Sequence, residues 1–294
     1  MPPFPAIARP VAMRSLAAGT ALALLVAGAA WATSAPPPSP RHPATQAQAG
    51  DAALTYSIHI GGMHVLDAQA HMGIVDDVYR VGLALETQGF LGRIASWKTD
   101  VRARGSLAAD MPQPARFTAH GAWLEEPRMT TLDYMPDGTP EITLAEPVPE
   151  EDREPVPDAL RKDTLDPVSA IVAVLDQVRR TGNCDLTVPV YDGRQRYDLE
   201  FADKGRETLA PSTLSAFAGE AQRCAVTYKP VAGRWKERNN RRDRDGDGRR
   251  DTGRDVSLWI APAAPGQPMV PVRLEMASPL GPVMVHLAKL DRVP

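Results

Sequence analysis

The most distinctive chemical signal in the sequence is a run of aspartates at alternating positions. Asp243, Asp245 and Asp247 occupy positions one, three and five of this run, and Asp251 occupies position nine. A calcium-binding loop presents its oxygen ligands to the cation in this way. Position twelve should carry a closing acid but is an arginine, and Asp255 comes one residue late.

The residues around these aspartates are rich in arginine. Residues 234–255 contain 9 basic and 6 acidic side chains, and this excess of positive charge disfavours a divalent cation. Two interpretations therefore stay open: a degenerate loop that binds Ca²⁺, or a solvated charged loop between two strands. Ca²⁺ is the one cofactor that the sequence suggests.

Signals for enzymatic chemistry are weak. The sequence contains no Gly-x-Ser-x-Gly nucleophile motif, no phosphate-binding loop and no dinucleotide-binding glycine motif. The six histidines form no His-Glu-x-x-His motif, although His59 and His71 could meet across neighbouring strands and bind a metal. We therefore expect a protein that is not an enzyme. The net charge of -3 also argues against a nucleic-acid-binding protein.

The N-terminal residues have the pattern of an export signal. Arg9 and Arg14 precede an apolar run from Leu16 to Trp31, and Ala30-Trp31-Ala32 offers a cleavage site with small residues. We expect residues 1–32 to be a Sec-type signal peptide and the protein to reside in the periplasm or cell envelope. The alternative is an anchor that is retained, and only then would the protein associate with a membrane.

Export determines how the two cysteines are interpreted. Cys184 and Cys224 both lie beyond the signal segment, and an oxidising compartment favours a disulfide between them. Residues 33–50 are rich in proline and alanine and are expected to form a disordered spacer. Residues 51–294 are then expected to form a single β-rich domain, with the charged loop at 234–255.

Alternating apolar residues dominate that domain. Leu54, Tyr56, Ile58 and Ile60 share one face of a strand, and the Gly61-Gly62 turn follows them. The same period predicts further strands near residues 68–74, 79–85, 97–101, 117–123, 130–134, 186–191, 197–201, 223–229, 256–260, 270–276 and 283–287. Residues 141–166 are acidic and rich in proline, and are expected to cross the surface in an extended form.

One segment has helical spacing. Asp166-Pro167 supplies an N-cap followed by a proline at the first helical position, and apolar residues then recur every three or four positions up to Val178. A second, short helix is possible at residues 212–220. The sequence predicts a mainly β (α+β) fold: a large curved antiparallel sheet, or half-barrel, of about a dozen strands wrapped around one main helix at 166–180.

Several short motifs, in this order, resemble a known family. They are residues 54–62, Gly89-Phe90-Leu91-Gly92, residues 165–170, Asn183-Cys184, residues 191–194, residues 224–228, residues 259–262 and residues 271–275. They are similar to the bacterial envelope family catalogued as the domain of unknown function numbered 3108. That family is similar in architecture to Lol-type lipoprotein carriers, in which a curved sheet wraps helices and holds acyl chains.

The resemblance implies a groove between the helix and the concave face of the sheet. We expect it to hold a lipid, a lipoprotein acyl chain or a hydrophobic peptide. The alternative is a structural or interaction module of the periplasm with a filled core, which would bind partners through its charged loops. The residues expected to line the groove are Ile171, Val172, Leu175, Val178, Met276 and Met284.

Overall fold

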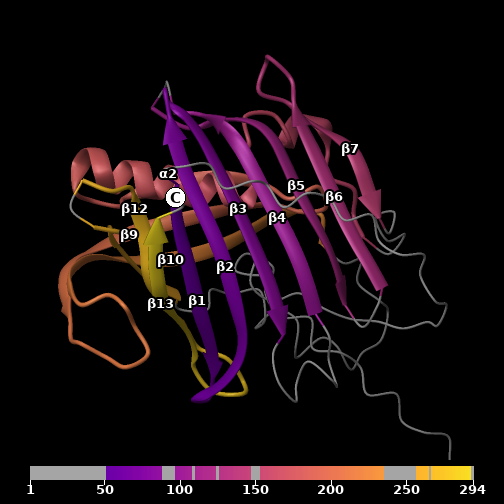
Figure 1. Ribbon diagram of the computed structural model, residues 1–294. Coiled ribbons are helices and arrows are strands. Elements are labelled where there is room, and N and C mark those ends of the chain that lie inside the picture. Colours follow the sequence, from indigo (N-terminus) through magenta and orange to yellow (C-terminus); the bar gives the residue numbers. More distant parts are fainter. Residues whose placement is uncertain are drawn as a thin grey trace, which may run out of the picture.

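The computed structural model describes residues 51–87, 97–107, 110–123, 126–146, 153–234, 256–264 and 266–292. Within these ranges the chain forms one antiparallel sheet of thirteen strands and one α-helix (Figure 1). The sheet is curved and does not close into a barrel. This arrangement confirms the predicted fold class.

The first half of the domain is a seven-stranded meander. Its strands are β1 (Ala52–Ile60), β2 (Met63–Val75), β3 (Val78–Thr87), β4 (Trp97–Ser106), β5 (Gln113–Trp123), β6 (Glu126–Tyr134) and β7 (Pro140–Glu146). Each strand pairs with the next one in the sequence. Three of the turns contain residues with positive φ, at Gly61-Gly62, at Asp76-Asp77 and at Gly138.

The second half begins with a short 3-10 helix and the α-helix and then forms a second meander. Its elements are η1 (Asp158–Leu160), α2 (Pro167–Thr181), β8 (Leu186–Tyr191), β9 (Arg196–Leu209), β10 (Gly219–Ala232), β11 (Val256–Pro262), β12 (Met269–Met276) and β13 (Val283–Arg292). β13 pairs with β1, so the two meanders join in the middle of the sheet and β7 and β8 lie at its two edges.

Helix α2 has both of the end signals that the sequence contains. The Asp166 carboxylate accepts the backbone N–H groups of Val168 and Ser169 at 3.0 and 2.9 Å. At the other end, Gly182 adopts φ +74° and its N–H donates to the carbonyl of Val178. The predicted helix is therefore confirmed, shifted by one residue at each end.

Two local predictions were wrong. Residues 141–146, expected to begin an extended crossing, belong to the edge strand β7 (Pro140–Glu146), because they pair with β6 after the turn at residues 136–139. The possible helix at 212–220 does not form. In its place the Ser212 and Ser215 hydroxyls accept nearby backbone N–H groups in tight turns, and β10 already begins at Gly219.

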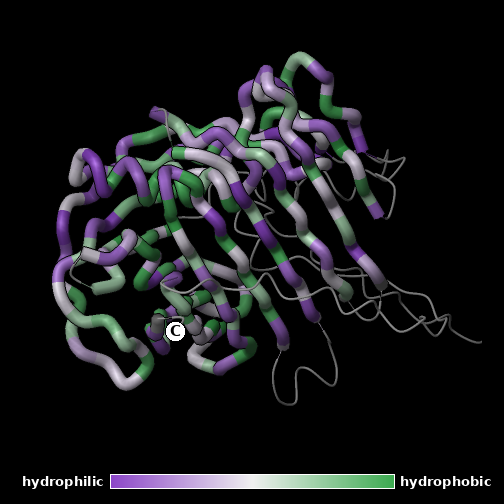
Figure 2. Tube along the Cα trace, turned by 45° about the horizontal axis from the view of Figure 1, so that its top comes forward, coloured by the Kyte–Doolittle hydropathy of each residue, from purple (hydrophilic) through white to green (hydrophobic). Residues whose placement is uncertain are grey.

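The core lies on the inner side of the curved sheet. Apolar and polar residues alternate along the strands (Figure 2), and in β1 the side chains of Leu54, Tyr56 and Ile58 are all buried. Helix α2 crosses this inner side (Figure 1) and is itself buried over most of its length. A helix with so little exposed surface is stabilised mainly by packing against the sheet.

The structure joins Cys184 and Cys224 in the expected disulfide, and both residues are fully buried. Cys184 precedes β8 and Cys224 lies on β10, so the bond spans the intervening strand β9. The Asp203 carboxylate on β9 accepts the backbone N–H of Cys184 and the side-chain amide of Gln222. The disulfide thus ties one edge of the sheet to the interior strands.

None of the helical residues in the described ranges forms a segment with the length and apolar character needed to cross a membrane.

Candidate functional site

An apolar cavity of about 170 Å³ lies between α2 and the inner face of the sheet. It is not fully enclosed by protein. Its wall comes from both meanders, with β1, β2 and β3 on one side and β9 to β13 on the other. The side chains that line it include Leu54, Tyr56, Ala68, Ala70, Met72, Val81, Leu83, Leu199, Phe201, Val226, Leu258, Val270, Leu274 and Val285.

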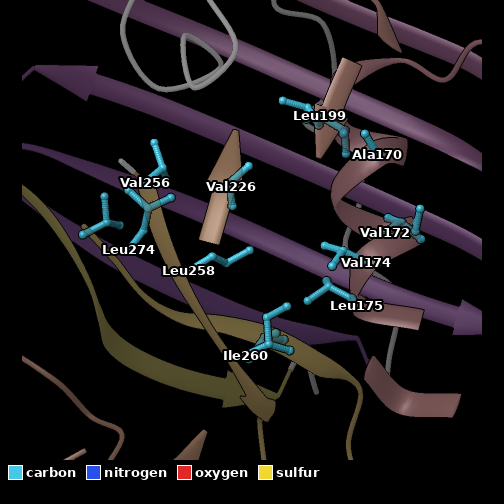
Figure 3. Packing of buried hydrophobic residues seen from close by; sticks show 14 of the residues in the cluster. Ala170, Val172, Val174, Leu175, Leu199, Val226, Val256, Leu258, Ile260 and Leu274 are labelled. Atoms are coloured by element: carbon cyan, nitrogen blue, oxygen red, sulfur yellow. The ribbon is translucent and has the colours of Figure 1, made fainter. Parts of the chain in front are cut away.

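The helix contributes one stripe of side chains to this wall. Val168, Ile171, Val172 and Leu175 occupy positions i, i+3, i+4 and i+7, so they share a face of α2. Figure 3 shows Leu175 extending toward Leu258 on β11. The spacing that predicted the helix therefore also positions these four residues on the cavity.

Opposite the helix, small residues make room for the cavity. Ala68 and Ala70 lie on the inner face of β2, where larger side chains would fill the space. Tyr56 on β1 brings a hydroxyl group into the core, and this hydroxyl donates to the carbonyl of Pro271 at 2.9 Å. Burial raises the pKa of Tyr56, so the phenol stays neutral and its polar atom is satisfied.

The size and lining of the cavity suit a hydrocarbon group. An apolar cavity of about 150 Å³ engineered in another protein stays dry and binds benzene, because its wall offers water no hydrogen bonds. The cavity in this protein has a similar volume, about 170 Å³, and an almost wholly hydrocarbon wall, although it is partly open to solvent. It can hold a short segment of an acyl chain.

The sequence-predicted groove residues divide into two groups. Ile171, Val172 and Leu175 line the cavity, as expected. Val178 is buried elsewhere in the core, and Met276 packs against the core at the end of β12. Met284 alternates with the buried Val283 and Val285, so it lies on the opposite face of β13. Sequence reasoning did not name the strand residues of the wall, although their alternation indicated which of them face inward.

A comparison with protein-family models matches the family described as "Protein of unknown function (DUF3108)" over residues 55–288. The chain belongs to this family. No curated protein matches the chain. Among solved structures, the chain is similar to a crystal structure of a β-barrel-like protein from Brucella abortus that carries the domain of unknown function DUF1849. The two share 9% sequence identity at a TM-score of 0.48, and the match covers 84% of this chain and 99% of that chain.

The histidines of this DUF3108 protein are not arranged as expected. The Gly61-Gly62 turn sets a register that places His59 opposite His64, with ring centroids 5.2 Å apart, and His286 of β13 lies 5.9 Å away. His71 lies farther along β2, opposite Ala53, so the predicted meeting of His59 and His71 is wrong. Desolvation lowers the pKa of His59, and the neighbouring His64 lowers it further, which favours the neutral ring.

Metal binding has no support in the described part of the chain. No group of three or more His, Cys, Asp or Glu side chains there is placed to hold a metal ion. The five aspartates of the calcium-like run, Asp243, Asp245, Asp247, Asp251 and Asp255, lie outside the described residues, so the Ca²⁺ interpretation stays a prediction.

A buried polar network fixes the start of α2 next to the cavity. The Ser169 hydroxyl lies 2.5 Å from the second Asp166 carboxylate oxygen and 2.7 Å from the Tyr79 hydroxyl. Burial raises the pKa of Asp166 to about 6, although its hydrogen bonds with Ser169 and Val168 oppose this shift. The network holds Pro167 and Val168, which belong to the cavity wall, against the sheet.

Proposed function

We propose that this DUF3108 protein is an exported, non-enzymatic binder of a hydrophobic ligand, a lipid or a lipoprotein acyl chain, in the cell envelope. The observation that carries the proposal is the apolar cavity of about 170 Å³ between α2 and the inner face of the sheet. The ligand would enter this cavity with its hydrocarbon part.

Export is supported by two features of the chain. Residues 1–32 have the charge and hydropathy pattern of a signal peptide. The buried disulfide between Cys184 and Cys224 is typical of proteins that fold in an oxidising compartment such as the periplasm.

A binding role is supported by the chemistry of the cavity wall. Binding a hydrocarbon requires burial of apolar surface and no proton transfer, and the wall is built almost entirely from aliphatic and aromatic side chains. Each methylene group removed from water contributes about 0.8 kcal/mol. A segment of about six methylenes would therefore contribute about 5 kcal/mol before the cost of ordering the chain.

Cavity-filling variants test this proposal. Ala68→Leu and Ala70→Leu place added methyl and methylene groups in the cavity. Ala84→Leu is the matched control, because Ala84 is exposed on β3 between the inward-facing Leu83 and Leu85. The binding of Nile red, a neutral apolar dye, is followed by fluorescence, and native mass spectrometry detects any lipid that copurifies with the protein.

We expect wild-type protein and Ala84→Leu to bind the dye with equal affinity, and the two cavity variants to bind it at least tenfold more weakly. Equal binding by all four proteins, with no copurified lipid, would contradict the proposal. If the cavity variants were then also more stable than wild type, the result would favour the alternative of a structural module with a filled core, because filling a void improves packing.

A further inference from the structure

A second cavity, also of about 170 Å³, lies beside the first and has a different character. Strands β4, β5 and β6 form one wall, and the turn between β8 and β9 together with Arg153 forms another. Three arginines line it, Arg128, Arg153 and Arg194, with Asp192 as the one carboxylate among the lining residues. Its remaining wall is made by Trp97, Thr99, Val101, Phe117, Ala119, Gly121, Met129, Thr130, Pro167 and Gln195.

The turn that carries Arg194 is held rigidly. Asp192 accepts the backbone N–H groups of Arg194 and Gln195 at 2.8 and 2.7 Å. Gly193 adopts φ +92° and approaches β6 so closely that a β-carbon there would lie 2.6 Å from a Thr130 methyl group. The turn is therefore docked against the far end of the sheet, and Arg194 faces the cavity from a fixed backbone.

Arg153 and Arg128 are also held in place by the backbone around them. Arg153 donates a hydrogen bond to the carbonyl of Gly233 at 3.2 Å, and the next residue, Glu154, donates its backbone N–H to the carbonyl of Arg234. Arg128 extends from β6, where it pairs with Gly121 of β5. Among the described residues that line this cavity, three carry a guanidinium group and one carries a carboxylate, and Arg153 and Arg194 both act electrostatically on that carboxylate, Asp192.

The two cavities adjoin at the N-terminal end of α2. Pro167, the first residue of the helix, lies in the walls of both. Leu83 of the apolar cavity and Val101 of the arginine-lined cavity are direct partners across β3 and β4. An extended molecule that passed beside Pro167 would place an apolar part in one cavity and a charged part in the other.

We propose that the ligand of this protein is an anionic amphiphile, whose acyl chain occupies the apolar cavity and whose carboxylate or phosphate headgroup binds among Arg128, Arg153 and Arg194. This inference rests on the proposed function and adds the class of ligand to it. Guanidinium groups match both headgroups, because they donate two parallel hydrogen bonds to a pair of anionic oxygens.

Three ligands with matched chains test the inference: decanoate, methyl decanoate and decyl phosphate. Titration calorimetry of wild-type protein should show that the two anions bind at least tenfold more tightly than the neutral ester, since charge-assisted hydrogen bonds account for a factor of about ten or more. The comparison between decanoate and decyl phosphate identifies which headgroup the site prefers.

Two single substitutions test whether Arg128 and Arg194 cause the preference for anionic ligands. Arg128→Gln and Arg194→Gln should each bind the anions about tenfold more weakly and leave the affinity for methyl decanoate unchanged. Arg206→Gln is the matched control, because Arg206 lies on β9 with an exposed side chain, 3.7 Å from Glu220, and lines neither cavity. Its affinities should equal those of the wild type.

If wild-type protein binds methyl decanoate as tightly as decanoate, the inference of an anionic headgroup is wrong, but the proposed binding of a hydrophobic ligand is not contradicted. Wild-type protein that binds none of the three ligands would overturn the proposed function as well. Both results are obtained on unaltered protein, so they do not depend on the stability of any variant.

Discussion

The buried carboxylate of Asp166 predicts an unusual dependence of stability on pH. Asp166 is fully buried, and burial raises its pKa to about 6 in the folded protein, against 3.8 for the ordinary side chain. The folded state therefore binds this proton more tightly than the unfolded state does. The resulting stabilisation is fully present below pH 3.8 and is lost as the pH rises to about 6.

The magnitude follows from the two pKa values. Each tenfold change in proton affinity is about 1.4 kcal/mol, so the whole effect is about 3 kcal/mol, of which about 2 kcal/mol falls between pH 4 and pH 7. Asp166→Asn removes the ionisation but keeps an oxygen that accepts the N–H groups of Val168 and Ser169. We therefore expect the stability of Asp166→Asn relative to wild type to rise by about 2 kcal/mol from pH 4 to pH 7.

Urea unfolding at several pH values, followed by circular dichroism, measures this difference. Asp158→Asn is the control, because the Asp158 side chain is 94% exposed, and its stability difference from wild type should not change by this amount. Asp166→Ala should be about 1 kcal/mol or more less stable than Asp166→Asn, since it also loses the helix cap. A stability difference between Asp166→Asn and wild type that is the same at every pH would refute the raised pKa.

Two further predictions concern stability. Replacing both Cys184 and Cys224 with serine should lower the free energy of unfolding by about 4 kcal/mol, because the bond closes a loop of 40 residues. Denaturant unfolding of the wild type, with and without reductant, and of the double variant measures this difference. Equal stability of the oxidised wild type and the double variant would contradict the prediction. Gly193→Ala should destabilise the protein by at least 1 kcal/mol more than Gly182→Ala, because both glycines have positive φ but only Gly193 would collide with Thr130. Thermal unfolding of the two variants compares them, and equal losses would show that the turn moves freely away from β6.

Much of the fold could be predicted because its signals are local. The alternation in β1 and the capping residues of α2 each lie within a few positions of the structure they determine. Strand β7 was missed because it opens a segment rich in acids and prolines, and its pairing with β6 decides its conformation. The misplaced histidine pair shows the same limit, since the partner of His59 depends on the register set by the Gly61-Gly62 turn.

The candidate site was only partly predictable for a similar reason. The helix stripe of Val172 and Leu175 follows from helical spacing, so the part of the cavity wall that α2 contributes was accessible from the sequence. Arg128, Arg153 and Arg194 are far apart in the sequence and share no motif. The curvature of the sheet brings these three arginines together, and local sequence patterns do not predict that curvature.

The pairing of β1 with β13 determines the order in which the sheet can be assembled. Among the described strands, every other pair joins neighbours in the sequence, so each meander can form through short-range contacts. The central pair joins the two strands that lie farthest apart, and closing so long a loop is entropically costly and slow. The apolar cavity draws its wall from both meanders, so it is complete only when β1 and β13 are paired. Deletion of β13 would leave two separate sheets, with β1 and β12 as new exposed edges prone to aggregation.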